Sequence, residues 1–154
     1  MNDFEKAFQR VIVAEGGMTN DPHDSGGLTK FGISQKAFPT LDIANLTLQG
    51  AKDIYYLDYW LAAKCDLLPY PLSAFVFDAA VNQGTAMAKK MLQEAARVKA
   101  DGVIGPVTLD AVKNDPDIAH KFMTERALRY FGTSGFYRFG HGWLNRIFKL
   151  AREA

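Results

Sequence analysis

The sequence predicts a mainly α-helical domain that carries a small β-hairpin or loop insertion after its first helix. Apolar residues recur at helical spacing through most of the chain, while glycine and turn-forming residues concentrate in one early stretch. A length of 154 residues suits one domain with one core, and no repeat, linker or low-complexity tract divides the sequence. We therefore expect residues 1–154 to fold as a single domain.

The first helix is predicted from apolar side chains that share one helical face near the N-terminus. These side chains are Phe4, Phe8, Val11 and Ile12. Asn2 or Asp3 is expected to cap the start of this helix, and Gly16-Gly17 is expected to end it. Turn formers dominate from Met18 to Thr29, which predicts the loop or short irregular hairpin.

The later helices are predicted from the same periodicity and from their capping residues. Thr47, Thr85 and Asp115 are expected as N-caps. Pro106 is expected at a first helical position, and Gly84 at the end of a compact apolar helix. The predicted helical segments are 47–65, 71–83, 85–100, 106–112, 115–131 and 141–154.

Charge and cysteine content exclude some classes of protein. Eighteen basic and seventeen acidic residues give a net charge of +1, which argues against a broad nucleic-acid-binding surface. Cys65 is the single cysteine, so an intramolecular disulfide is impossible. The apolar neighbours of Cys65 predict a buried and unreactive thiol.

The N-terminal segment MNDFEKAFQR is charged and amphipathic, and therefore does not resemble a signal peptide. No stretch approaches the ~18 apolar residues that are needed to span a bilayer. We expect synthesis in the cytoplasm and no stable membrane insertion. A target outside the cytoplasm would then require a separate delivery route.

Glu15 is the first candidate for chemistry. Helix residues turn by about 100° each, so a helix that reaches Glu15 places it within roughly 20° of Phe4, on the apolar face. Desolvation on that face and the negative end of the helix dipole both raise the pKa of a carboxyl group. A carboxyl that stays protonated near neutral pH can donate its proton to a leaving oxygen. The alternative is an ordinary helix-end glutamate that leans into solvent.

Asp24 and Thr29 are the candidates that accompany Glu15. Asp24 follows nine residues later, across a turn-rich stretch that can fold back and set a second carboxylate opposite the first. Glycosidases commonly use such a pair of acids. Thr29 comes five residues after Asp24 and can orient a water through its hydroxyl. As an alternative, Asp24 can bond its own backbone in a turn, which is the interpretation we favour for Asp21.

The sequence lacks the motifs of several other common catalytic chemistries. The sequence contains no HExxH, no GxSxG, no phosphate-binding glycine loop and no Cys/His cluster with metal-ligand spacing. We therefore expect neither a metal nor another cofactor. His23 lies close to the candidate acids and can line a cleft, although a surface loop position is the simpler interpretation.

Aromatic and amide side chains form a second group of candidates, because sugar rings offer C–H faces and N-acetyl groups offer amides. Our candidates for substrate binding are Tyr59, Trp60, Asn82 and Gln83. A place in the core is the alternative for the aromatic residues, and it suits Trp60 and Trp143 better than a cleft does. Asn82 and Gln83 stand at a helix end and fit either role.

The stretch EGGMTNDPHDSGGLTKFGIS resembles the signature of glycoside hydrolase family 108. Members of this family are N-acetylmuramidases of the lysozyme-like superfamily, found largely in phages, prophages and bacterial secretion loci. The segments YYLDYW, FDAAVNQG, DGVIGPVT and GWLNRI resemble the family in order and spacing, so the resemblance covers nearly the whole chain. DGVIGPVT also resembles a loop that is common in peptidoglycan-binding modules.

The resemblance implies a lysozyme-like fold and a lysozyme activity that lyses bacterial cell walls, as phage or prophage endolysins do. The bond cleaved is the β-1,4 bond between N-acetylmuramic acid and N-acetylglucosamine. Glu15 matches the family's catalytic acid. Asp24 fits the spacing of phage lysozymes, whereas Thr29 falls one residue short of it. The resemblance also implies a catalytic part over about residues 1–90, with a peptidoglycan-binding-like helical part over about 91–154 packed on it.

Two alternative functions remain. A lytic transglycosylase breaks the same bond with one glutamate and needs no second carboxylate such as Asp24. A non-catalytic peptidoglycan-binding protein would use the aromatic residues and leave Glu15 without a role. In each case we expect a monomer that reaches the periplasmic or extracellular cell wall after release by a holin or a secretion system.

Overall fold

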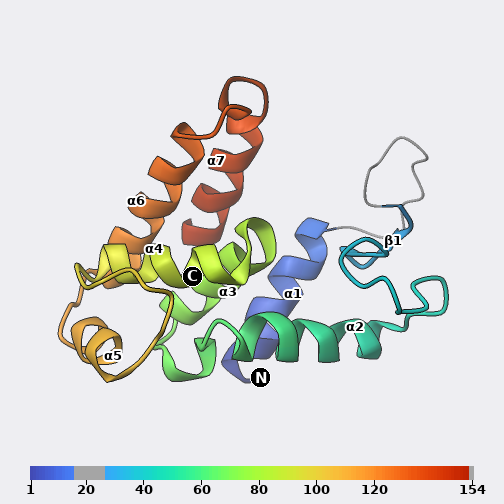
Figure 1. Ribbon diagram of the computed structural model, residues 1–154, viewed down its shortest axis with the longest axis horizontal. Helices are drawn as coiled ribbons and strands as arrows, with labels where there is room; N and C mark the ends of the chain where they lie inside the picture. Colours follow the sequence, from blue (N-terminus) through green and yellow to red (C-terminus); the bar gives the residue numbers. More distant parts are fainter. Residues whose placement is uncertain (16–26, 153–154) are drawn as a thin grey trace. The chain divides into compact units, whose positions relative to one another are not determined.

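The computed structural model describes residues 1–15 and 27–152. The described part is mainly helical with one two-stranded antiparallel sheet, which confirms the predicted fold class. It forms two compact units, Met1–Asp58 and Tyr59–Ala154 (Figure 1). The first unit contains α1 (Asp3–Glu15), β1 (Thr29–Lys30), β2 (Ile33–Ser34), α2 (Leu48–Ile54) and the start of η1 (Tyr55–Leu61). The second contains the rest of η1, η2 (Cys65–Leu67), α3 (Leu72–Gln83), α4 (Thr85–Ala95), α5 (Pro106–Lys113), α6 (Ile118–Phe131) and α7 (Phe136–Arg152).

Helix α1 begins with a capping box whose N-cap is Asn2, one of the two residues predicted to cap this helix. Asn2 Oδ1 accepts a hydrogen bond from the Glu5 backbone N–H at 2.8 Å, and Glu5 Oε2 accepts one from the Asn2 N–H at 3.3 Å. Phe4, Phe8 and Val11 are buried, so the predicted apolar face of the helix is confirmed. The predicted stop at Gly16-Gly17 lies outside the described residues.

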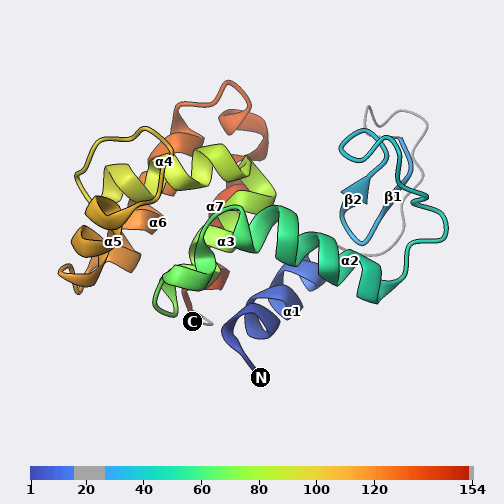
Figure 2. The same ribbon diagram turned by 60° about the horizontal axis from the view of Figure 1, so that its bottom comes forward.

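The strands β1 and β2 form a tight hairpin that Figure 2 shows from the side. Its two central residues, Phe31 and Gly32, have φ values of 53° and 77°, as a type I′ turn requires. Tyr55 Oη donates a hydrogen bond to the Phe31 carbonyl at 3.0 Å. Ile33 is buried at 2% exposure, so the hairpin is fixed both by a side-chain bond and by an apolar anchor.

Helix α2 starts at the predicted cap, where Thr47 Oγ1 accepts a hydrogen bond from the Gly50 N–H at 3.0 Å. The prediction of one helix over 47–65 is wrong beyond Ile54, because η1 continues as a π-helix. Apolar periodicity does not distinguish these two kinds of turn, since both keep the chain helical. The boundary between the two units falls inside η1, and a catalytic part that extends to about residue 90 stays a prediction.

The core of the second unit is built around α3, whose residues 72–80 are all buried. Helix α3 contacts α4 and α6, and α7 contacts α6 (Figure 1). The helix ends as predicted at Gly84, which has a φ of 93° that suits glycine. Cys65 is buried, and burial, together with the charge of Asp66, raises the pKa of its thiol, as expected for an unreactive cysteine.

The loop before α5 is held by one buried amide. Gln93 on α4 donates through Nε2 to Asp101 Oδ1 at 2.9 Å and to the Val103 carbonyl at 3.0 Å. Gln93 Oε1 accepts from the Gly102 N–H at 2.7 Å. Pro106 then occupies the first position of α5, as predicted. The DGVIGPVT segment is therefore fixed to the helical core of its unit.

One predicted cap and two predicted helix starts are wrong. Helix α4 begins at Thr85, as the predicted segment does, but its cap is Gly84 instead of Thr85. Helix α6 begins at Ile118, because Asp115 instead accepts from the Asp117 N–H at 3.0 Å and closes a turn. Helix α7 begins at Phe136.

The early start of α7 was hidden by its glycines, which have low helix propensity. The structure gives Gly140 a packing reason: a Cβ built at this position would lie 2.6 Å from the ring of Phe136. A larger residue would therefore collide with a ring one turn earlier in the same helix.

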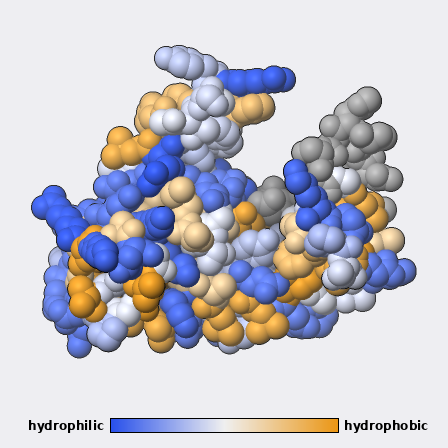
Figure 3. Space-filling view, viewed as in Figure 1, coloured by the Kyte–Doolittle hydropathy of each residue, from blue (hydrophilic) through white to orange (hydrophobic). Residues whose placement is uncertain are grey.

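Hydrophilic and hydrophobic residues are mixed over the face drawn in Figure 3. Of the helices that the structure describes, none has the length and apolar character needed to cross a membrane.

Candidate functional site

The predicted acid stands at the end of α1. The helix reaches Glu15, which meets the condition for placing this residue on the face of Phe4 and Val11. The side chain of Glu15 lies outside the described part of the structure, so its burial stays a prediction. Asp24 and His23 also lie outside the described residues.

Thr29 is the first residue of β1 and pairs with Ser34 across the hairpin. It is half-buried, and the hairpin that carries it is tied to Tyr55 through the Phe31 carbonyl. A hydroxyl on a short, anchored strand has a defined position. Its predicted role with water stays a prediction.

The aromatic candidates differ in exposure. Trp60 is 4% exposed and lies edge-on to Phe77, with ring centroids 5.5 Å apart, so its ring belongs to the core of the second unit. Tyr59 is half-buried. Trp143 is also half-buried and stacks on Tyr130, with centroids 5.1 Å apart. Of the two tryptophans, Trp60 is therefore the one with almost no surface to offer a sugar.

Asn82 and Gln83 lie side by side in the last turn of α3, where α6 holds both amides. Arg126 Nε donates to Gln83 Oε1 at 2.9 Å, and Arg126 Nη2 is 3.4 Å from Asn82 Oδ1. Tyr130 Oη donates to Asn82 Oδ1 and accepts from Arg126 Nη2 at 3.3 Å. The structure thus unites two candidate residues with two residues that the sequence did not single out.

A buried ion cluster supports this arrangement one turn earlier on α3. Asp78 is 2.6 Å from Arg126 Nη2 and 2.9 Å from Arg146 Nη2. Burial alone would raise the pKa of Asp78, but the charges and hydrogen bonds of Arg126 and Arg146 outweigh it and hold that pKa below its usual value. Asp78 therefore stays ionised and joins α3 to both α6 and α7.

The sequence contained a signal for this cluster. Asp78 is the one charged residue in the apolar segment LSAFVFDAAVNQ, and a charge in a buried helix needs a partner. Asn82 follows Asp78 by one helical turn, as Tyr130 follows Arg126. One sequence alone does not show which basic residue pairs with Asp78, because the partners are 48 and 68 positions away.

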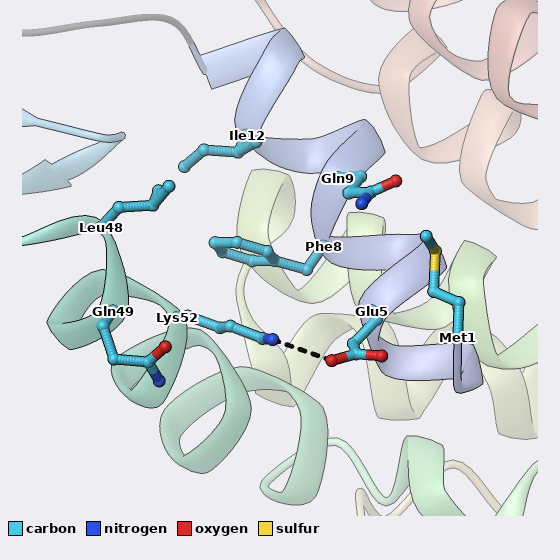
Figure 4. A pocket seen from close by; sticks show the side chains of 8 residues that line it. All are labelled: Met1, Glu5, Phe8, Gln9, Ile12, Leu48, Gln49 and Lys52. Carbon is cyan, nitrogen blue, oxygen red and sulfur yellow. Dashed lines mark hydrogen bonds and ion pairs between the residues drawn. The ribbon is translucent and has the colours of Figure 1, made fainter.

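A pocket of about 600 Å³ lies in the first unit between α1 and α2 (Figure 4). Phe8, Ile12 and Leu48 line it with apolar surface, and the ion pair of Lys52 Nζ with Glu5 Oε1, at 3.0 Å, closes one side. The pocket contains none of the predicted site residues. We assign no role in the reaction to it.

Comparison with known proteins identifies the class. The family model described as Glycosyl hydrolase 108 matches residues 8–84, half of the chain. The chain is also similar to the solved structure of Brucella abortus SagA, with 34% sequence identity and a TM-score of 0.86. The alignment covers 97% of this chain and 92% of that chain. Among curated proteins, none matches this sequence.

The fold and the family match together define a glycoside hydrolase with a lysozyme-like fold. The chain belongs to glycosyl hydrolase family 108. The matched residues 8–84 include the stretch from Glu15 to Thr29 and the amide pair at Asn82 and Gln83. Family and structural likeness together support a peptidoglycan hydrolase.

Proposed function

We propose that this protein is an N-acetylmuramidase that cleaves the β-1,4 bond between N-acetylmuramic acid and N-acetylglucosamine in peptidoglycan. One observation carries the proposal: the family match spans Glu15, Asp24 and Thr29, and α1 continues far enough to present Glu15 at its C-terminal end. A carboxyl at this end of a helix, near the apolar face, has a raised pKa.

The proposed mechanism is general acid catalysis. Glu15, protonated, donates its proton to the glycosidic oxygen as the bond breaks. Asp24 stabilises the positive charge that develops on the sugar, or activates water from the opposite face. Thr29 orients that water through its hydroxyl. The carboxyl separation decides the stereochemistry, with roughly 5 Å for retention and roughly 6.5–9.5 Å for inversion.

The central test is Glu15→Gln, which keeps the shape of the side chain and removes its proton. We expect the release of soluble fragments from purified peptidoglycan to fall by about 10²–10⁴-fold, because that is the usual contribution of a positioned acid. Glu125→Gln makes the same chemical change on α6 and serves as the control. Unchanged lysis by Glu15→Gln, with circular dichroism like that of the wild type, would refute the assignment of the acid.

Mass spectrometry of the products separates the proposal from a lytic transglycosylase. Hydrolysis leaves reducing sugar ends, whereas the transglycosylase reaction leaves 1,6-anhydro ends because the sugar's own hydroxyl attacks. Asp24→Asn adds a second criterion, since only the hydrolase is expected to need that carboxylate. Binding to sacculi without any soluble product would instead indicate a non-catalytic binding protein.

We further propose that the protein acts as a monomer on the periplasmic or extracellular cell wall, in the manner of a phage or prophage endolysin. A holin or a secretion system would deliver it. Cell fractionation with and without a co-expressed holin tests the first of these routes.

A further inference from the structure

We propose that Asn82 and Gln83 form a donor subsite for the acetamido carbonyl oxygen of an N-acetylated sugar, and that Arg126 and Tyr130 are the positioning residues that set its polarity. The inference rests on the proposed function, because it assigns a substrate group to the same reaction. Hydrogen bonds from α6 join both amides at the end of α3.

The polarity of both amides follows from their partners. An arginine side chain only donates hydrogen bonds, so Arg126 can meet Gln83 only at Oε1 and Asn82 only at Oδ1. Tyr130 Oη accepts from Arg126 and therefore donates its own proton to Asn82 Oδ1. Each amide oxygen is thus turned toward α6, and each NH₂ group is left as a donor.

These NH₂ groups are available to a ligand. Asn82 is exposed and Gln83 is half-buried, and within the described part of the chain neither Asn82 Nδ2 nor Gln83 Nε2 makes a hydrogen bond. The next residue, Gly84, is exposed, and a Cβ built on it would meet no atom within 4 Å. The helix end therefore combines two unused donors with a following glycine whose Cβ position no other residue crowds.

The orientation of the amides is held from behind. The Arg126 side chain has no exposed surface and is clamped to Asp78, whose carboxylate also holds Arg146. Turning either amide over would bring an NH₂ group against the donors of Arg126, and turning Gln83 over would also take from Arg126 Nε the oxygen that accepts its hydrogen bond. Two arginines against one carboxylate also leave a net positive charge, which favours an electron-rich ligand atom. A carbonyl oxygen, with two lone pairs and no proton, matches two donors best.

Asn82→Asp and Gln83→Glu test the subsite without disturbing its support. Each new carboxylate can still accept from Arg126, and Asn82→Asp can still accept from Tyr130. The surplus positive charge of the cluster favours the ionised form of either variant, so the fold should persist. Only the NH₂ donors are lost, and they are replaced by an acceptor that repels a carbonyl oxygen.

We expect KM on purified peptidoglycan to rise by about 10- to 100-fold in either variant, because a donor is lost and an acceptor faces another acceptor. The turnover number kcat should change much less, since the subsite binds substrate without reacting with it. Tyr130→Phe keeps the ring that stacks on Trp143 and removes one anchor of Asn82, so its KM should rise by a smaller factor. Gln9→Glu introduces the same charge on an exposed position of α1 and should leave KM unchanged.

Chemically de-N-acetylated peptidoglycan completes the experiment, because it lacks the carbonyl oxygen that the subsite would bind. The wild type should discriminate against this substrate, and Asn82→Asp and Gln83→Glu should lose most of that discrimination. Folded variants that keep the wild-type KM, or that discriminate as the wild type does, overturn the subsite. A wild type that releases no product refutes the proposed function instead. The subsite is then tested by NMR titration of the Asn82 and Gln83 side-chain amides with N-acetylglucosamine tetramer, where unshifted signals overturn it.

Discussion

The two units differ in how ion pairs hold their helices. In the first unit, Glu5 and Lys52 join α1 to α2 with side chains that are 37% and 29% exposed. In the second, Asp78 and Arg126 join α3 to α6 with side chains that are 6% and 0% exposed. Water screens the first pair and not the second, so equivalent substitutions should have very different effects.

The two units also differ in the roles proposed for their residues, which are catalysis in the first unit and substrate binding in the second. Glu15 and Thr29 belong to the first unit, where a partly exposed ion pair joins α1 to α2 and the Tyr55 phenol bonds to the hairpin, in addition to apolar contacts. Asn82 and Gln83 belong to the second unit, where a buried cluster fixes their orientation. A binding subsite needs such fixed donors, because each donor ordered in advance reduces the entropy lost when substrate binds.

The largest effect is expected for Asp78→Asn. This change keeps the size of the side chain but leaves Arg126 buried without a carboxylate. We expect the free energy of unfolding to fall by about 3–5 kcal/mol, as is usual when one partner of a buried pair is removed. Urea denaturation measures the change, and Asp110→Asn on the exposed surface of α5 is the matched control. Equal urea midpoints for the two variants would show that the buried Asp78 contributes no more to stability than the exposed Asp110 does.

The pH dependence of unfolding gives a second readout of the same residue. The folded pKa of Asp78 lies below its unfolded value, so its contribution is complete above the unfolded pKa of about 3.9 and is lost as the pH falls through the folded pKa. The wild type should therefore lose more stability than Asp78→Asn when the pH is lowered below about 4. Parallel curves for both proteins over this range would contradict the assignment.

The two units also show which features of the fold could be predicted from the sequence and which could not. Local signals predicted the fold class and the caps at Asn2 and Thr47, because a cap depends on residues within one turn. They failed at Asp115, whose carboxylate closes a turn before the helix begins. They also failed at Gly140, which the helix needs for contact with Phe136.

The candidate site also combines features that the sequence predicts with features that depend on distant contacts. Helical phase and family resemblance pointed to Glu15 without any tertiary information. Asn82 and Gln83 were predicted from their chemistry, but their polarity was not, since it depends on Arg126, 43 residues beyond Gln83 in the chain. A contact over that distance leaves no periodicity in a single sequence.

The next largest effect on stability is expected for Tyr55→Phe, in the first unit. Loss of the phenol removes its hydrogen bond to the Phe31 carbonyl and should lower the free energy of unfolding by about 1 kcal/mol. The turn holds Phe31 at a positive φ, where a non-glycine residue is strained, and the Tyr55 bond is one of the contacts that hold it there. Amide hydrogen exchange at Ile33 should accelerate in the variant, and Tyr137→Phe on the exposed surface of α7 should leave the rate unchanged.

The smallest effect is expected for Lys52→Met, which keeps the length of the side chain and removes its charge. The pKa of Glu5 is lowered first by the hydrogen bond from Lys52, then by the backbone N–H of Asn2 and the Lys52 charge. In the variant this pKa should rise, yet stay below its usual value because the Asn2 bond remains. NMR titration of the Glu5 carboxyl measures both parts of the expectation.

The stability change in Lys52→Met should be much smaller than that in Asp78→Asn, because water solvates both members of the Glu5–Lys52 pair when they separate. The folded pKa of Glu5 lies below its unfolded value, so any contribution of the pair is present at neutral pH and fades as the pH falls through that pKa. Added salt should therefore reduce the difference between wild type and Lys52→Met at neutral pH, and leave the effect of Asp78→Asn nearly unchanged. A loss of stability in Lys52→Met as large as that in Asp78→Asn would show that solvent exposure does not determine how much each ion pair contributes.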